Sequence, residues 1–143
     1  MNSYGLIDLH CDTLAEYWKY AHTGNPDTLD DPGRVLSLSN MPKDVHWAQF
    51  YAVFIPDEER GQAAIDYFEK NRANFYRQME KFGDRVAPCR NADDMEKAWA
   101  AGKTAAFLTI ENGSALAGDL SRVHTLAEQG VRAITLTWNG ENE

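Results

Sequence analysis

Two kinds of hydrophobic pattern alternate along this 143-residue chain. Short runs of apolar, β-branched and aromatic residues predict strands at residues 6–10, 47–55, 104–110 and 131–137. Between them, apolar residues recur at spacings of three and four and predict helices at about 58–82, 91–102 and 119–130. The polar stretch from about 20 to 40, rich in Asp, Pro, Gly and Asn, predicts a loop.

The longest predicted helix carries an apolar stripe that only Arg72 interrupts, and Gly83 stands where a glycine ends a helix. A helix that covers a sheet needs such a stripe, so we assign it to core packing rather than to a cofactor site. In the two later helices, Asn91 and Asp119 are expected to be the N-caps. The stripe consists of Ile65, Phe68, Phe75, Met79 and Phe82.

The alternation of strands and helices predicts an α/β fold with a parallel sheet, since parallel strands are joined by helical crossovers. A doubly wound sheet and a closed (β/α) barrel both fit this order of elements. Both architectures place their ligands at the carboxyl ends of the strands. The chain is long enough for one domain with its own core.

Charge and composition argue against several classes of binding partner and cellular location. The net charge of −8 argues against nucleic acid or an anionic membrane as a partner, because both would repel the chain. No apolar run approaches the roughly 20 residues that span a bilayer, and the first residues lack the pattern of a secretory signal. Cys11 and Cys89 show no metal or redox spacing. We therefore expect a cytoplasmic, reduced protein.

The first predicted strand leads into a His-x-Asp pair that can coordinate a metal ion. Successive side chains of a strand point to opposite faces, so His10 and Asp12 share one face and Cys11 points away. Imidazole and carboxylate are both standard zinc ligands. Asp8 is expected on the same face, deeper in the strand, where it would orient the imidazole or serve a structural role.

Glu111 immediately follows the third predicted strand. In a parallel sheet this position lies on the same rim as His10 and Asp12, and the two oxygens of a glutamate can bridge two metal ions. A second interpretation stays open, in which Glu111 is a loop acid that caps the helix start led by Gly113 and Ser114.

Four ordered motifs resemble the membrane dipeptidase (renal dipeptidase) family of zinc peptidases, almost from end to end of the chain. The resemblance implies that His10 and Asp12 bind one zinc ion and that Glu111 bridges it to a second. It also implies a TIM (β/α)8 barrel and a metallodipeptidase that hydrolyses dipeptides with a metal-activated water. The motifs are Asp8-Leu-His10-x-Asp12, Gln49-Phe-x-Ala-Val-Phe-x-Pro56, Ile-Glu111-x-Gly and Leu126-x-x-x-Gly130-Val-Arg-x-x-Thr-Leu-Thr137.

Two departures from the family pattern matter. The family takes two further histidine ligands from later strands, whereas this sequence extends only a few residues past its fourth predicted strand. Trp138 stands where the best-known members have a substrate-contacting histidine. An indole has no basic nitrogen, so we expect Trp138 to line a substrate wall instead. Surface or packing roles are expected for the remaining histidines, which are His22, His46 and His124.

Four strands cannot close an eight-stranded barrel. We therefore expect residues 1–143 to form a single partial domain, the N-terminal half (about four β/α units) of a TIM (β/α)8 barrel. Its last strand would be an exposed edge, covered either by a missing C-terminal half or by a second copy in a homo-oligomer.

Three functions stay open. The first is a zinc-dependent dipeptidase, inactive as the isolated chain, although manganese or cobalt would suit the same donors. The second is another metal-dependent barrel hydrolase, an amidohydrolase or a phosphoesterase. Amidohydrolases usually carry His-x-His on the first strand, whereas this chain has His-x-Asp. The third is a catalytically incompetent half-domain that serves assembly.

Overall fold

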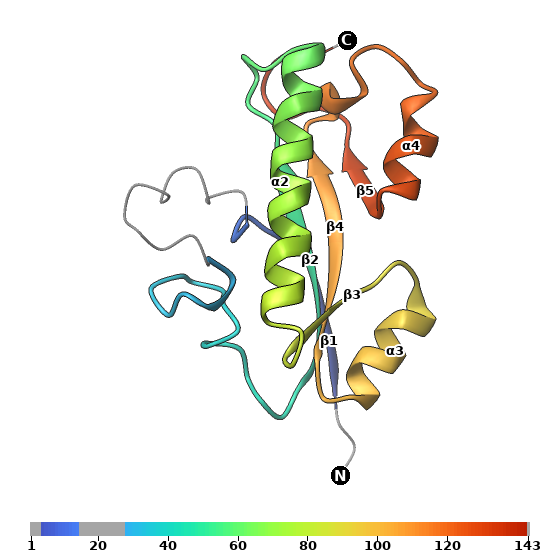
Figure 1. The fold of residues 1–143 in the computed structure, drawn as a ribbon. Coiled ribbons are helices and arrows are strands. Elements are labelled where there is room, and N and C mark those ends of the chain that lie inside the picture. The colour runs from blue at the N-terminus through green and yellow to red at the C-terminus, as the bar shows by residue number, and fades with distance from the viewer. Residues whose placement is uncertain (1–3, 15–27, 143) are drawn as a thin grey trace.

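The computed structural model describes residues 4–14 and 28–142, and within them a parallel sheet of five strands forms the centre (Figure 1). β2 pairs with β1 on one edge and with β4 on the other. The second edge of β4 is shared by β3 at its start and by β5 at its end. The strands are β1 (Gly5–Cys11), β2 (His46–Phe54), β3 (Val86–Pro88), β4 (Thr104–Glu111) and β5 (Val131–Thr135).

From β2 onwards helices connect successive strands, and the predicted α/β fold with parallel pairing is confirmed. α2 joins β2 to β3, α3 joins β3 to β4, and α4 joins β4 to β5. Two short 3-10 helices, η2 and η3, precede β2 and follow β4. The bounds are α2 (Gln62–Lys81), α3 (Ala92–Ala100), α4 (Arg122–Glu128), η2 (Thr28–Asp30) and η3 (Gly113–Leu116).

The structure adds one strand and moves several boundaries. β3 is absent from the prediction, because three residues that end in a proline are too short to show a strand pattern. α2 begins at Gln62 rather than near residue 58, after Gly61 has adopted a left-handed φ of 53°. β5 ends at Thr135, two residues earlier than predicted.

One of the two expected N-caps is confirmed. The Asn91 side chain accepts a hydrogen bond from the backbone N–H of Asp94 at 2.8 Å, which satisfies a free donor of the first turn of α3. The prediction for Asp119 is wrong, because α4 begins at Arg122 with Ser121 as its N-cap. The Asp119 carboxylate instead accepts from the Ser121 N–H in the preceding turn.

The main core lies between α2 and the sheet, and α2 runs along one face of β2 and β4 (Figure 1). β4 is buried from 105 to 110, as its nearly continuous run of small and apolar residues predicts for a strand covered on both faces. A smaller cluster around α3 covers part of the opposite face, where Phe50 and Phe107 stack with ring centroids 4.6 Å apart. The largest buried side chains of the main core include Tyr51, Phe68, Phe75, Leu108 and Ile110.

The buried face of α2 is more polar than the predicted stripe. Phe68, Phe75 and Met79 are buried as expected, whereas Ile65 and Phe82 remain partly exposed. The buried face of α2 also contains three polar side chains, namely Asn71, Asn74 and Gln78. The Gln78 Oε1 accepts from the Leu29 N–H at 2.8 Å, which ties η2 to α2. This amide is buried because the loop before β2 needs a hydrogen-bond partner inside the core.

The outer strands of the described sheet each have a single neighbour. β1 pairs with β2 and β5 pairs with β4, so one edge of each has no strand beside it in the part of the chain that the structure describes. The expected exposed edge at the last strand is therefore confirmed for these residues. Large apolar side chains are exposed on or next to both strands, namely Leu6, Ile7, Leu9, Leu136 and Trp138.

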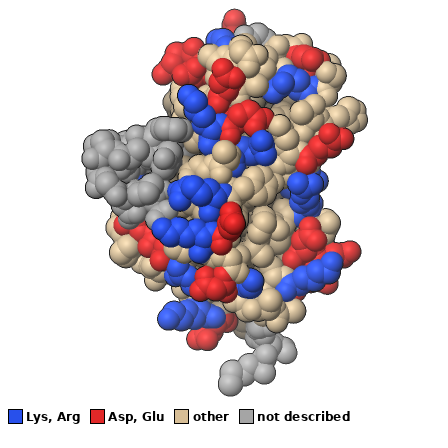
Figure 2. All heavy atoms as spheres, viewed as in Figure 1, with Lys and Arg blue, Asp and Glu red and all other residues tan. Residues whose placement is uncertain are grey.

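Acidic and basic side chains are interspersed over the face that carries α2 (Figure 2). The described helices are each too short or too polar to cross a lipid bilayer. One of the ion pairs, between Asp30 and Arg85, holds η2 to the start of β3 through two hydrogen bonds of 2.8 and 2.7 Å. These bonds, aided by one from Ser39, lower the pKa of the Asp30 carboxyl.

We expect Asp30→Asn to lower the free energy of unfolding by less than about 1 kcal/mol at neutral pH, since the pair is partly exposed. A lowered pKa means that the ionised carboxylate stabilises the fold at neutral pH and that this contribution is lost as the pH falls through the lowered pKa. Urea unfolding at neutral and strongly acidic pH measures the difference. Glu80→Gln, at an exposed position of α2, is the control. A difference that persists after full protonation would contradict this assignment.

Candidate metal centre

Three side chains that are predicted to share one rim do converge in the structure. His10 lies in β1, Asp12 is the first residue after β1, and Glu111 is the last residue of β4. The His10 Nε2 is 3.3 Å from Asp12 Oδ1 and 3.5 Å from Glu111 Oε2. The three candidate ligand atoms all lie within 4.8 Å of one another, and no other group of this kind occurs among the described residues.

The donor set fits a divalent metal ion. Zinc binds imidazole nitrogen and carboxylate oxygen at about 2.0–2.2 Å, which puts neighbouring donors of one ion about 3.0–3.5 Å apart. The two distances from the His10 Nε2 match this spacing. Burial and the nearby charge of Asp12 raise the pKa of Glu111, whereas His10 lowers it. Two carboxylates held this close repel each other, and a bound cation would remove that repulsion.

A β-bulge in β1 aims His10 at this group. Asp8 is in register with Gln49, but Cys11 is in register with Tyr51, so two residues of β1 oppose one residue of β2. Asp8 and Cys11 therefore point to the same face as Tyr51, which packs in the core under α2. His10, beside Glu111, lies on the other face.

This bulge overturns the expectation that Asp8 shares the strand face of His10, although Asp8 lines the same cleft as His10 and Asp12. Its carboxylate accepts a hydrogen bond from the backbone N–H of His10 at 3.2 Å, and so contacts the backbone rather than the imidazole of that residue. Cys11 does point away from His10, as predicted. Burial raises the pKa of the Cys11 thiol to about 12, so this cysteine stays protonated at neutral pH.

Glu111 is held in place through the turn that follows it. The Glu111 carbonyl accepts from the Ile55 N–H at 2.9 Å. The next residue, Asn112, is fully buried with a φ of 77°. Its Nδ2 donates to the Ile55 carbonyl at 2.9 Å and to Asp57 Oδ1 at 3.1 Å. Asn112 therefore ties the carboxyl end of β4 to that of β2.

The same turn is also tied to the end of β5. The Asn112 Oδ1 accepts from the Asn142 Nδ2 at 2.9 Å, and the Gly113 N–H donates to the Leu136 carbonyl at 3.0 Å. A Cβ on Gly113 would lie 2.9 Å from that carbonyl oxygen, so a side chain does not fit here. Sequence analysis did not identify Asn112, although the Asn-Gly pair is a turn signal. The turn leads into η3, so a helix start does follow Glu111, but its hydrogen-bond cap is Asn112.

Trp138 lies on the same rim. Its ring meets the Phe54 ring edge to face, with centroids 4.8 Å apart. Phe54 is in register with Glu111, so these two side chains point to the same face of the sheet. The Trp138 side chain is about half exposed beside the candidate metal centre. The cleft next to His10 and Asp12 has a volume of about 380 Å³ and includes the loop residues 34–36 in its lining.

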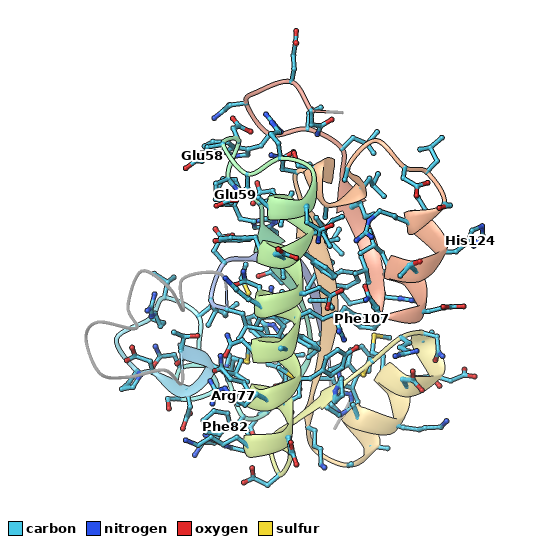
Figure 3. The ribbon with its side chains drawn as sticks, turned by 45° about the horizontal axis from the view of Figure 1, so that its top comes forward. Glu58, Glu59, Arg77, Phe82, Phe107 and His124 are labelled. Atoms are coloured by element: carbon cyan, nitrogen blue, oxygen red, sulfur yellow. The ribbon has the colours of Figure 1, made fainter. Side chains whose placement is uncertain are left out.

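The other histidines lie elsewhere or outside the described residues. His46 is the first residue of β2, at the opposite end of the sheet from Glu111, and stacks on Trp99. His124 is exposed on α4 (Figure 3). The prediction for His22 falls outside the described residues. Within the described structure, neither His46 nor His124 joins the candidate centre.

Comparison with protein families matches the whole chain, residues 1–143, to the membrane dipeptidase family, peptidase family M19. Comparison with curated proteins gives no match.

Three solved structures share the fold. The dipeptidase AC, a metallopeptidase, is 19% identical with a TM-score of 0.82, and the match covers 99% of this chain and 45% of that one. A metallopeptidase from Rhodobacter sphaeroides, liganded with a phosphinate mimic of the dipeptide L-Ala-D-Ala, is 17% identical with a TM-score of 0.82 over 99% and 47%. The probable dipeptidase PvdM from Pseudomonas aeruginosa is 20% identical with a TM-score of 0.75 over 95% and 35%. The chain thus spans less than half the length of each.

We expect Asn112→Ala to lower the free energy of unfolding by about 2–4 kcal/mol, because buried partners lose their hydrogen bonds and alanine disfavours a positive φ. Asn112→Gly is the matched control, since glycine accepts this φ but lacks the amide. Asn112→Gly should therefore lose less stability than Asn112→Ala. Denaturant unfolding of both variants separates the stability lost with the hydrogen bonds from the stability lost because alanine disfavours a positive φ. A loss below about 0.5 kcal/mol in Asn112→Ala would show that the turn does not depend on this side chain.

Proposed function

This chain belongs to the membrane dipeptidase family, peptidase family M19, and from that membership we propose that it forms part of a zinc-dependent dipeptidase. The observation that carries the proposal is the convergence of His10, Asp12 and Glu111 from two separate strands. This arrangement favours the metal-bridging interpretation of Glu111 over that of a helix-capping acid, because its carboxylate faces the imidazole.

We assign His10 and Asp12 to one zinc ion and Glu111 to the bridge between that ion and a second one. The paired ions would polarise the scissile carbonyl and lower the pKa of a bound water towards neutrality. The protein's own contribution is to position the metal ligands. The bulge in β1 turns the His10 imidazole towards Glu111, and the Asn112 turn holds the end of β4 against β2 and β5. Manganese and cobalt are the alternative metals that such donors accept.

A dipeptide is the proposed substrate. A solved relative from the same fold carries a phosphinate mimic of L-Ala-D-Ala, which supports this class of substrate here. In this chain the Phe54–Trp138 pair stands on the rim beside Glu111. We propose that its half-exposed indole lines one wall of the substrate site and contacts an apolar part of the dipeptide.

The activity is proposed for the complete barrel. Two zinc ions need about four ligands each, and the described residues bring three protein donors together. The open edges of β1 and β5, with their exposed apolar side chains, are where the remaining strands of a barrel would pair. A (β/α)8 barrel of this kind would be completed by a C-terminal half or by a second copy of the chain.

In a barrel that contains residues 1–143 together with their complementing half, we expect hydrolysis of dipeptides and no cleavage of lactones or phosphate esters. His10→Ala should abolish the metal-dependent turnover, because the imidazole is the one nitrogen donor of the group. Turnover of an Ala-Ala dipeptide with added zinc is the measurement. His124→Ala, which removes an exposed histidine of α4, is the control and should retain full activity. Unchanged turnover in His10→Ala would remove this residue from the site.

For the isolated chain as a monomer, we expect weak zinc binding and no dipeptidase activity, because only three protein donors converge. Isothermal titration with zinc, run beside sedimentation to establish the monomer, measures both affinity and stoichiometry. Tight binding of two ions by the monomer would contradict the proposed incompleteness while leaving the metal assignment of His10 intact.

A further inference from the structure

Two Asn-Gly pairs lie near the carboxyl rim of the sheet. Asn112-Gly113 forms the turn after β4, and Asn139-Gly140 lies in the segment after β5. In an Asn-Gly pair the backbone nitrogen of the glycine can attack the side-chain amide carbon of the asparagine, because the glycine has no Cβ that hinders the approach. Both pairs have this same intrinsic chemistry, so a difference in their reactivity has to come from the fold.

The fold holds Asn112-Gly113 in an unreactive arrangement. Asn112 is fully buried, which keeps out the water that the reaction consumes. Its Nδ2 donates to the Ile55 carbonyl, and its Oδ1 accepts from the Asn142 Nδ2. The N–H of Gly113, whose nitrogen would be the attacking atom, donates to the Leu136 carbonyl at 3.0 Å. Attack at Asn112 therefore requires a local opening that breaks these bonds together.

The fold places no such restraint on Asn139-Gly140. The Asn139 side chain is exposed, and residues 136–142 belong to no strand or helix. Within residues 4–14 and 28–142, no hydrogen bond holds the Asn139 side-chain amide or the Gly140 N–H. Solvent water reaches this amide directly, and an irregular surface segment changes its backbone conformation more readily than a buried turn does.

We propose that Asn139 is a site of spontaneous deamidation, and that its isoaspartyl product releases the segment after β5 from the rim. The Gly140 nitrogen loses its proton to solvent and forms a bond to the Asn139 Cγ. The Cγ–Nδ2 bond breaks, and Nδ2 takes up a proton and leaves as ammonia. Water then opens the cyclic succinimide. Opening at Cγ gives aspartate, whereas opening at the main-chain carbonyl carbon gives isoaspartate. No step involves the metal centre, so the proposal is independent of the proposed dipeptidase activity.

Isoaspartate at position 139 alters the contact between this segment and the loop after β2. Gly140 packs closely on Asp57, since a Cβ on Gly140 would lie 3.0 Å from the Asp57 Cγ and Oδ2. The isoaspartyl chain runs through the former Asn139 Cγ, so the backbone before Gly140 becomes one carbon atom longer. The reaction also adds a carboxylate near that of Asp57, and like charges repel each other. The lengthened segment therefore no longer fits against Asp57.

This change affects the residues on either side of the contact. Trp138 immediately precedes Asn139, and its ring meets the Phe54 ring edge to face. Asn142, on the other side, donates to the Asn112 Oδ1. Both interactions depend on the path of the segment between them, so we infer that the isoaspartyl product loses the contact between Trp138 and Phe54.

Peptide mapping of the full chain tests the site of reaction. Trypsin cuts after Lys and Arg, so it places Asn112 in the peptide 104–122 and Asn139 in the peptide 133–143. After incubation of the folded chain in mildly alkaline buffer, we expect deamidation at Asn139 to be at least about tenfold faster than at Asn112, because only Asn112 needs a local opening. Tandem mass spectrometry locates the modified residue, and enzymatic methylation distinguishes isoaspartate from aspartate.

The same incubation in guanidinium chloride is the matched control, since unfolding removes the hydrogen bonds of Asn112 and leaves both dipeptides intact. We expect the two sites to react there at rates within about threefold of each other. A ratio below about tenfold in the folded chain would overturn the proposal. A preference for Asn139 that persists in the denaturant would also overturn it, because the fold would not be the cause.

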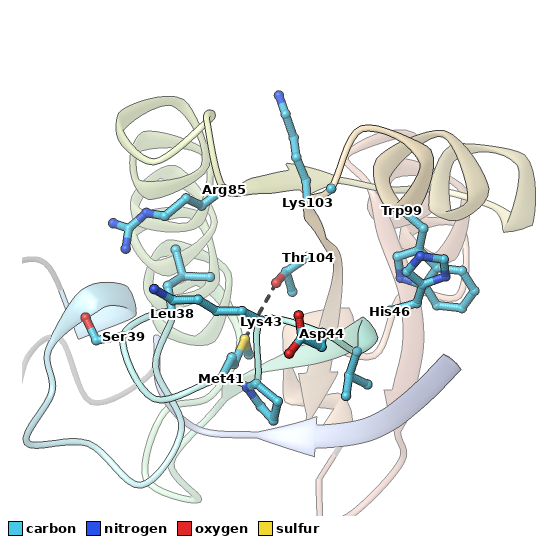
Figure 4. A pocket seen from close by; sticks show the side chains of 13 residues that line it. Leu38, Ser39, Met41, Lys43, Asp44, His46, Arg85, Trp99, Lys103 and Thr104 are labelled. Atoms are coloured by element: carbon cyan, nitrogen blue, oxygen red, sulfur yellow. Dashed lines mark hydrogen bonds between the residues drawn. The ribbon is translucent and has the colours of Figure 1, made fainter. Parts of the chain in front are cut away.

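Proton NMR tests the release of the segment. We expect the nuclear Overhauser contact between the Trp138 and Phe54 rings to disappear in the isoaspartyl fraction. The stack of Trp99 on His46, in the wall of a pocket at the opposite end of the sheet, should keep its contact (Figure 4). Asn139→Ser cannot form the succinimide, so this variant should retain both contacts after the same incubation. A Trp138–Phe54 contact that survives in the isoaspartyl fraction would overturn the proposed release.

Discussion

The burial of β4 between neighbours on both of its edges is the constraint on which the rest of the structure depends. This strand is in register with β2 along its length, ending with Phe54 opposite Glu111. A slip of one residue would turn every side chain of β4 to the opposite face, exposing Leu108 and Ile110 and burying Glu111 under α2. The apolar core therefore fixes the direction in which the Glu111 carboxylate points, and the candidate metal centre depends on hydrophobic packing several residues away.

Two local irregularities of the backbone also help to direct the three candidate metal ligands towards one another. In β1 the bulge places two residues opposite one, so that His10 and Asp8 lie on opposite faces of the strand and His10 faces Glu111. After β4, Asn112 adopts a positive φ, a conformation that is costly for a residue other than glycine. Its buried side chain compensates through hydrogen bonds to Ile55, Asp57 and Asn142. One strained residue therefore stands directly after Glu111, as is common beside functional groups.

The two ends of the sheet differ in their chemistry. The carboxyl rim brings together one imidazole and two carboxylates, which suits a cation, and the aromatic pair of Phe54 and Trp138 stands beside them. The amino end holds a pocket with His46 and Trp99 stacked in its wall. Because β4 spans the distance between them, occupation of one end involves none of the side chains that form the other.

Periodicity and residue chemistry were enough to place β2, β4, α2 and α3, because burial imposes a spacing on the sequence that a reader can recognise. They were also enough to put His10, Asp12 and Glu111 on one rim, since parallel strands end on the same side. The face of Asp8, the strand β3 and the role of Asn112 were decided by the tertiary structure alone. Each depends on a register or a contact with a distant segment, and the side chain of Asn112 bonds to partners as far away as Ile55. The buried amides of α2 belong to the same class, because the loop that Gln78 satisfies lies 49 residues earlier in the chain.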